Sequence, residues 1–243
     1  MKDILQDIVA HTHQLGIIPL VKITGTSAET VIESMAEDRS VIINAKTKTP
    51  VAEFDGTFGM PNLDKLNLHL RNPEYKENAK IDVIRAQRNG NDIPVNLHFE
   101  NTAGDFSNDY RFMNQEIINE KLKPFKFRGA SWDIEFEPSM ASVGRLKLQA
   151  QAHTEETVFQ VKTDNNDLVF FFGDASTHAG SFTFHANVSA KLKQTWAWPV
   201  TQVMSILNLD GDKTMRISDA GAMQITVDSG LAVYDYILPA QSK

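Results

Sequence analysis

The chain has 243 residues, with 31 acidic and 24 basic side chains, a formal charge of −7 and no cysteine. This length predicts two domains of roughly 120 residues, each large enough to bury its own core. The lack of cysteine excludes disulfides, thiolate metal sites and cysteine nucleophiles. The acidic total argues against tight non-specific binding of nucleic acid, which requires Lys and Arg to neutralise phosphates, but it permits a local basic surface.

Two features of the sequence bear on its compartment. No apolar run approaches the roughly 18 residues that a membrane-spanning helix requires. The first residues, from Met1 to Ile4, mix acidic, basic and apolar side chains and do not resemble a signal peptide. We therefore expect an unprocessed cytoplasmic protein without a membrane partner.

The first half of the chain predicts two helices among short strands. Apolar residues at helical spacing, from Ile4 to Val9, predict a helix over residues 2–13. Three inward-facing leucines predict a second helix over 61–70, and Asn89-Gly90 between alternating runs predicts a hairpin. Strands are expected over residues 17–24, 30–35, 41–45, 51–54, 81–88, 93–99 and 106–113.

Residues 114–127 interrupt this pattern. The stretch is charged, shows no clear apolar periodicity and contains Pro124. These properties are typical of a linker between domains. We therefore predict a first domain over residues 1–113 and a second over 128–243.

The second half repeats the arrangement, with helices expected over 138–152 and 199–207 and strands over 131–136, 158–163, 168–172, 181–188, 195–198, 215–218, 223–227 and 231–238. Three of the four helices follow a strand-like run and a proline, namely Pro61, Pro138 and Pro199. Proline suits the first helical turn because its φ is fixed and its missing N–H would be unpaired there. The repetition indicates an architecture built from copies of one unit.

Enzyme-like combinations are weak. His11 and His13 are two residues apart, so on a helix they point in different directions, and no carboxylate cluster converges on them. Asp174, Ser176 and His178 lie close together, but without the strand–nucleophile–helix context of a hydrolase, and we interpret residues 173–180 as a polar hairpin loop. There is no Gly-Lys-Ser/Thr phosphate loop. We expect no catalytic activity, no cofactor and no metal.

Several segments resemble a known family. Residues 217–230 and 234–240 resemble the closing strands of a DNA polymerase sliding clamp, residues 31–41 resemble a strand pair near the start of such clamps, and residues 58–63 resemble the entry to their second helix. The order of the predicted helices and strands fits that of a sliding clamp along the whole chain. The resemblance is closest to the clamps of T-even-type bacteriophages, particularly those of cyanophages.

This resemblance implies an α+β DNA clamp fold with two similar domains, each with antiparallel sheets on the outside and two helices on the inner face of a ring. Six domains close such a ring, so two domains per chain imply a homotrimer. The implied function is that of a phage-encoded, non-catalytic processivity factor in the host cytoplasm. It would encircle duplex DNA independently of sequence, be loaded by an ATP-dependent clamp loader and bind the C-terminal peptide of the phage DNA polymerase.

The resemblance also implies three sets of site residues. Phosphate contacts fall on the solvent faces of the helices, at Lys2, Lys65, His69, Arg71, Arg145 and Lys147. The peptide groove falls on Met35, Val41, Tyr236, Leu238 and Pro239. The subunit interface pairs the strand near 106–113 with that near 180–188 of the next subunit, through Phe106, Tyr110, Phe112, Phe182 and Phe184. Each set has an alternative interpretation. The basic residues would be solubilising side chains, the groove residues would be core or strand-end residues, and the interface strands would be ordinary outer strands.

A rival hypothesis is a β-rich structural virion protein associated with the tail or capsid. It would share the cysteine-free composition, the exposed edge strands and the oligomerisation. Such a module has no reason to place four amphipathic helices at matching points, so the helix pattern favours the clamp.

Overall fold

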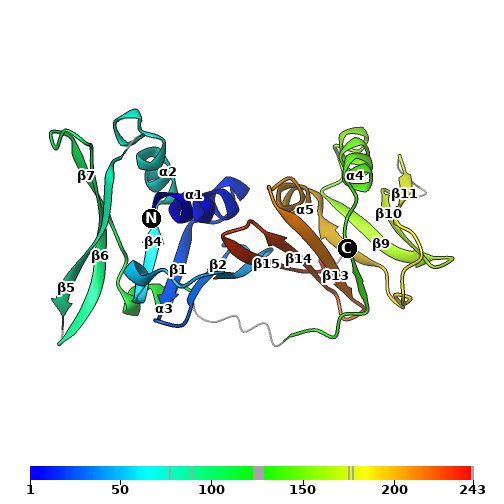
Figure 1. Cartoon of the computed structure of the whole chain (residues 1–243). Coiled ribbons are helices and arrows are strands. Elements are labelled where there is room, and N and C mark those ends of the chain that lie inside the picture. The colour runs from blue at the N-terminus through cyan, green and yellow to red at the C-terminus, as the bar shows by residue number, and fades with distance from the viewer. Residues whose placement is uncertain (77, 89, 123–128, 175, 177, 242–243) are drawn as a thin grey trace. The chain divides into compact units, whose positions relative to one another are not determined.

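The computed structural model describes residues 1–76, 78–88, 90–122, 129–174, 176 and 178–241. The chain forms two compact units (Figure 1). Unit 1 comprises Met1–Lys126 with Ser229–Tyr234, and unit 2 comprises Phe127–Asp228 with Asp235–Lys243. Among the described residues, no helix is both long enough and apolar enough to cross a membrane.

Unit 1 consists of antiparallel strands covered on one face by helices. One set of strands has the order β4-β1-β2-β3 and a second sheet has the order β5-β6-β7. Its elements are α1 (Lys2–His11), η1 (His13–Leu15), β1 (Leu20–Gly25), β2 (Thr30–Met35), β3 (Ile42–Thr47), η2 (Ala52–Phe54), β4 (Gly56–Pro61), α2 (Leu63–Arg71), η3 (Pro73–Tyr75), β5 (Lys80–Arg88), β6 (Asn91–Glu100), β7 (Ser107–Arg111) and α3 (Gln115–Lys121).

Unit 2 repeats this design. Its strands have the orders β11-β10-β9-β12 and β15-β14-β13-β8, and α4 and α5 pack against each other. Its elements are β8 (Ile134–Phe136), α4 (Met140–Ala152), β9 (Val158–Asp164), β10 (Asp167–Phe172), β11 (Gly180–His185), β12 (Trp196–Pro199), α5 (Val200–Leu207), β13 (Asp212–Ser218), β14 (Ala222–Asp228) and β15 (Ala232–Pro239). The last strand, β15, begins in unit 1 and ends in unit 2.

Most of the predicted elements are confirmed. The four predicted helices correspond to α1, α2, α4 and α5, and the pairing of Arg88 with Asn91 confirms the predicted hairpin between β5 and β6. Asn89 itself lies outside the described residues. Residues 51–54 were wrongly predicted as a strand, because Ala52–Phe54 forms a 3₁₀ turn and the strand follows it as β4.

The predicted position of the prolines was also wrong. Pro61 ends β4, Pro138 precedes the N-cap Ser139, and Pro199 is itself an N-cap, so none lies in a first helical turn. β4 and β12 are edge strands, where a residue without an N–H is tolerated. Pro61 and Pro199 therefore end a strand just before a helix begins, whereas Pro138 lies between β8 and α4.

The stretch predicted as a featureless linker contains the short helix α3. The side chain of Asn114 accepts a hydrogen bond from the Ile117 amide at 3.0 Å, which caps the helix. Ile118 is fully buried and packs closely against Gly59 of β4. A Cβ atom added to this glycine would lie only 2.9 Å from the Ile118 Cδ1 atom. One anchoring residue produces no apolar periodicity, which explains why the sequence pattern missed this helix. The domain boundaries themselves stay a prediction.

The core of unit 2 is built on aromatic rings from alternate positions of its strands. The Phe170 ring stacks on Phe184 at 4.2 Å and on Phe159 at 4.8 Å between ring centroids, and all three are essentially inaccessible to solvent. The next residue, Phe171, points to the opposite, partly exposed face, where Lys162 lies 5.4 Å from its ring. Alternation along β10 thus gives two adjacent phenylalanines different environments.

We expect Phe170→Ala to lower the free energy of unfolding by about 3–5 kcal/mol, because it leaves a cavity among stacked rings. Phe171→Ala is the matched control, and its cost should be about 1 kcal/mol because only a partly exposed cation–π contact is lost. Urea denaturation followed by circular dichroism measures both. Equal costs would contradict the assignment of faces in β10.

A buried polar cluster connects the start of β15 to α1 within unit 1. The Tyr234 hydroxyl donates to the Asp7 carboxylate at 2.7 Å, and the Tyr234 ring stacks on His11 at 4.5 Å. Burial alone would raise the pKa of Asp7, but hydrogen bonds from His11 and Tyr234 outweigh it and lower that pKa. These contacts explain why Ser229–Tyr234 belongs to unit 1.

Tyr234→Phe should lower the free energy of unfolding near neutral pH by about 1 kcal/mol, the usual net value of one hydrogen bond. Because the pKa of Asp7 is lower in the folded protein than in the unfolded chain, its carboxylate stabilises the fold fully at pH values above the unfolded pKa, near 4. This stabilisation is lost as pH falls through the folded pKa. The difference between Tyr234→Phe and wild type should therefore shrink in acid. Unfolding curves at several pH values measure it, and a constant difference would rule out an ionised Asp7 as the partner.

Candidate functional site

The solvent face of α2 carries free cations. Leu63, Leu66 and Leu70 are buried at helical spacing, which turns Lys65 and Arg71 outward. Both cations are exposed and have no hydrogen bond or ion pair within the described residues. This face therefore has charge available for a phosphate partner.

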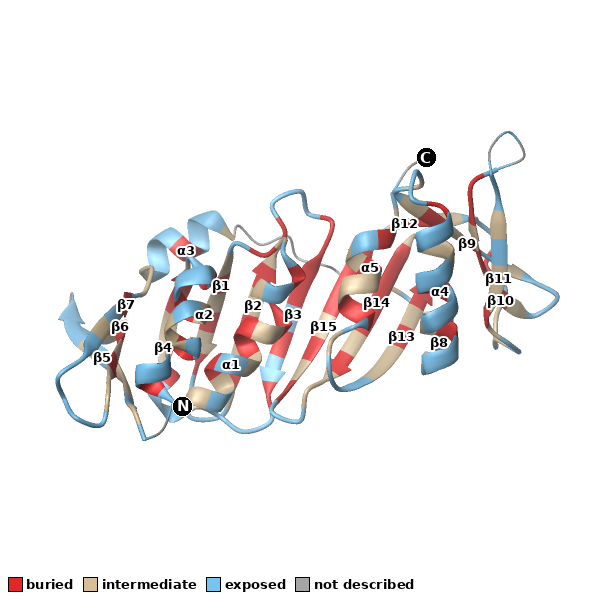
Figure 2. Cartoon of the chain, turned by 90° about the horizontal axis from the view of Figure 1, so that it is seen from above, coloured by how far each residue is buried: buried red, intermediate tan, exposed pale blue. Residues whose placement is uncertain are grey.

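The solvent face of α4 has the same character. Ser139 caps the helix, its hydroxyl accepting from the Ser142 amide at 3.1 Å, and Leu146 anchors it in the core. Arg145 and Lys147 are exposed, again without a polar partner in the described part of the chain, and the helix contains no acidic residue. Figure 2 shows the exposed outer sides of α2 and α4 and the buried sides that face the strands.

The structure gives two of the predicted phosphate contacts other roles. Lys2 donates to the backbone oxygen of Tyr75 at 2.6 Å and to that of Lys76 at 3.3 Å, so its ammonium ties α1 to η3. His69 stacks on Phe99 at 5.2 Å, and burial, with the charge of Lys65, lowers its pKa. His69 is therefore protonated less readily than an exposed histidine. The predicted set of six retains four free cations, two in each unit.

The residues predicted to line a peptide groove differ in exposure. Met35 is half-buried and Pro239 is exposed. Val41, Tyr236 and Leu238 have no accessible surface, and the Trp198 indole donates to the Leu238 backbone oxygen at 3.1 Å. Three of the five predicted residues thus serve as core, and Met35 and Pro239 offer surface.

The strands predicted to form the subunit interface, β7 and β11, are both edges of their sheets. Phe106, just before β7, is 40% exposed, and Phe112 and Phe182 are half-buried. Tyr110 and Phe184 are buried in their own units: the Tyr110 hydroxyl donates to the Pro61 backbone oxygen, and burial raises its pKa. Unpaired strand edges are templates for pairing with another chain.

The enzyme-like combinations do not assemble into an active site. His11 is buried beside Asp7, whereas His13 lies in the following 3₁₀ turn. The Ser176 hydroxyl donates to the Asp174 carboxylate at 2.6 Å, and no hydrogen bond from Ser176 to a histidine is found among the described residues. Among the described residues, no group of three or more His, Asp or Glu side chains is placed to hold a metal ion.

The sequence analysis did not single out a hollow of about 550 Å³ in unit 1. Its floor includes the buried Ile18 and Leu63, and its rim carries Glu37, Asp38 and Asp64. Glu37 and Asp38 are adjacent in the turn between β2 and β3, whereas Asp64 comes from α2, so no single local motif marks the hollow. Its charge would repel phosphate, and Asp64 places part of this acidic rim on α2 itself, beside Lys65.

Comparison with known proteins identifies the fold. No protein-family model matches the sequence, and no curated protein matches it. PCNA of A. fulgidus, solved with the C-terminal region of FEN-1 bound, matches with a TM-score of 0.68 at 10% identity, covering 100% of this chain and 95% of that one. PCNA from Thermococcus kodakaraensis matches with a TM-score of 0.67 at 10% identity, covering 99% of this chain and 97% of that one. Proliferating Cellular Nuclear Antigen from Entamoeba histolytica matches with a TM-score of 0.63 at 10% identity, covering 99% of this chain and 94% of that one. The chain therefore has the α+β DNA clamp fold predicted from its sequence.

Proposed function

We propose that the protein is a sliding clamp, a non-catalytic ring that encircles duplex DNA and tethers a replicative polymerase. The observation that carries this proposal is the likeness to PCNA, which covers 99–100% of this chain and 95–97% of the PCNA chains. The free cations on α2 and α4 support it, because sparse Lys and Arg contacts give weak, sequence-independent binding to phosphates. A closed ring needs no tight contact, since the topology prevents escape.

The proposal extends to the assembly. Two similar units per chain make three chains the count that completes six units, and the edge strands β7 and β11 are available for head-to-tail pairing. Phe106, Phe112 and Phe182 retain surface that such pairing would bury. Tyr110 and Phe184 would support the strands from within.

The proposal also includes a peptide partner and a loader. The A. fulgidus PCNA structure contains the C-terminal region of FEN-1, so a protein of this fold accepts a peptide segment. By analogy, this chain would accept the C-terminal peptide of a DNA polymerase near Met35 and Pro239 and would be placed on DNA by an ATP-dependent clamp loader. The resemblance in sequence favours a phage-encoded protein acting in the host cytoplasm.

Sedimentation equilibrium tests the assembly directly. We expect a species of about 82 kDa, three copies of the 27.2 kDa chain, that dissociates only on dilution. A monomer at every concentration would remove ring closure and with it the reason to regard the protein as a clamp. A dimer would contradict the head-to-tail trimer.

Charge reversal tests the DNA-facing surface. Lys65→Glu combined with Arg145→Glu should weaken retention on circular duplex DNA by at least about tenfold at moderate salt, with the trimer intact, because phosphate contacts are lost in every subunit. The matched control is Lys121→Glu with Lys162→Glu, which changes one exposed cation in each unit away from α2 and α4. Filter retention of loaded circles measures both, and equal loss in the two variants would refute the assignment of the lining.

A further inference from the structure

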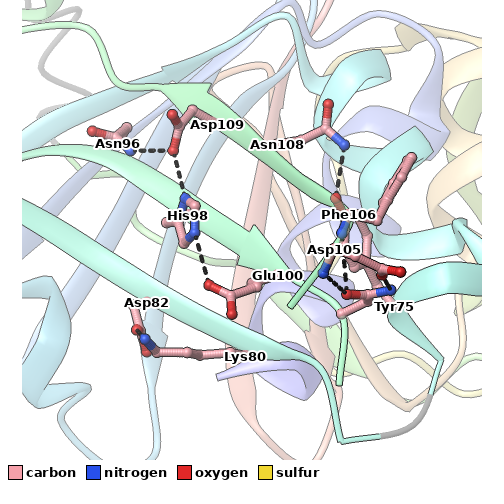
Figure 3. A network of polar contacts seen from close by, with 11 residues as sticks. Tyr75, Lys80, Asp82, Asn96, His98, Glu100, Asp105, Phe106, Asn108 and Asp109 are labelled. Carbon is pink, nitrogen blue, oxygen red and sulfur yellow. Dashed lines mark hydrogen bonds and ion pairs between the residues drawn. The ribbon is translucent and has the colours of Figure 1, made fainter. Parts of the chain in front are cut away.

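A histidine on the outer sheet of unit 1 lies between two carboxylates. In Figure 3, the His98 ring on β6 has Nδ1 2.9 Å from Asp109 of β7 and Nε2 3.4 Å from Glu100 of its own strand. His98 and Asp109 are directly opposite in the antiparallel register. The Asn96 side chain also donates to Asp109, at 2.9 Å.

This geometry depends on the charge of the ring. A neutral imidazole carries hydrogen on only one nitrogen, so it can donate to Asp109 or to Glu100 but not to both. The imidazolium carries hydrogen on both nitrogens and satisfies both carboxylates. The arrangement therefore fits the charged ring, and loss of the proton would leave a lone pair facing a carboxylate.

The other charges around His98 come from both neighbouring strands. Asp82 on β5 lies opposite His98 and is paired with Lys80 at 3.2 Å, and Lys80 lies opposite Glu100. On β7, Arg111 lies opposite Asn96. The hydrogen bond to Asp109 is the largest cause that raises the pKa of His98. Burial opposes it, and the hydrogen bond to Glu100 and the charges of both carboxylates add to the rise.

We propose that His98 is a proton-dependent latch that fastens the edge strand β7 to β6. The latch is closed below the ordinary pKa of histidine, near 6.5, and releases as pH rises through the higher pKa of the folded protein. Asp109 is the bonded partner on β7, so release loosens the edge strand itself. The consequence for ring assembly rests on the proposed function, in which β7 joins the next subunit, but the latch lies entirely within unit 1.

Hydrogen exchange of the full-length protein, read by mass spectrometry on peptides covering Ser107–Arg111, tests the latch. Protection factors corrected for the intrinsic pH dependence of exchange should fall about two- to five-fold between about pH 5.5 and about pH 9, the range expected for an exposed ion pair. His98→Arg keeps a permanent cation and should remove this pH dependence while retaining the protection. Asp109→Asn should show the low protection at both pH values.

Asp82→Asn is the matched control, because it removes a carboxylate facing His98 without removing a bond to β7. It should keep the pH dependence of wild type. Equal protection at both pH values in wild type, persistent pH dependence in His98→Arg, or its loss in Asp82→Asn would each overturn the latch. Sedimentation of the same samples separates the two proposals: a monomer with pH-dependent protection refutes the ring alone, and a trimer with pH-independent protection refutes the latch alone.

Discussion

The exposed faces of the helices exist because each helix contributes only a narrow apolar stripe to its core. On α2 the buried side chains are three leucines, and on α4 the buried apolar side chain is Leu146. Burial of these side chains supplies the dominant favourable free energy of packing. The remainder of each helix surface then has no role in the core, and its side chains are free to serve a partner.

The same constraint explains how an acidic chain can offer a basic surface. The net charge of −7 belongs to the whole protein, whereas α4 has two cations and no acid, and α5 has no charged residue. The helices of unit 1 are mixed, because α1 carries the exposed Asp3 and α2 carries the exposed Asp64, which also lines the unit 1 hollow. A small number of cations on one face suits a partner that is held by topology rather than by affinity.

Periodicity predicted most of the helices and strands, because it reports which side of an element is buried, whereas the fold was predicted from the resemblance to sliding clamps. A resemblance by position does not report burial, so it placed Tyr236 and Leu238 in a peptide groove although neither side chain has accessible surface. Sequence patterns also could not locate the distant oxygen that binds Lys2, because that acceptor lies 73 residues away. The Asn114 cap of α3 had a local signal, and its pattern was missed because only Ile118 is buried.

Tyr234 and Asp7 are 227 residues apart in sequence, yet their contact lies within unit 1. A ribosome must therefore synthesise nearly the whole chain before the first unit can acquire its last segment. Unit 1 would leave the ribosome incomplete, with the site for Ser229–Tyr234 open beside α1, until that segment has been synthesised. Contacts of such separation are slow to form, and partly assembled sheets with open edges are prone to aggregate. The order of synthesis thus delays the final step of folding the first unit until the segment Ser229–Tyr234 has been made.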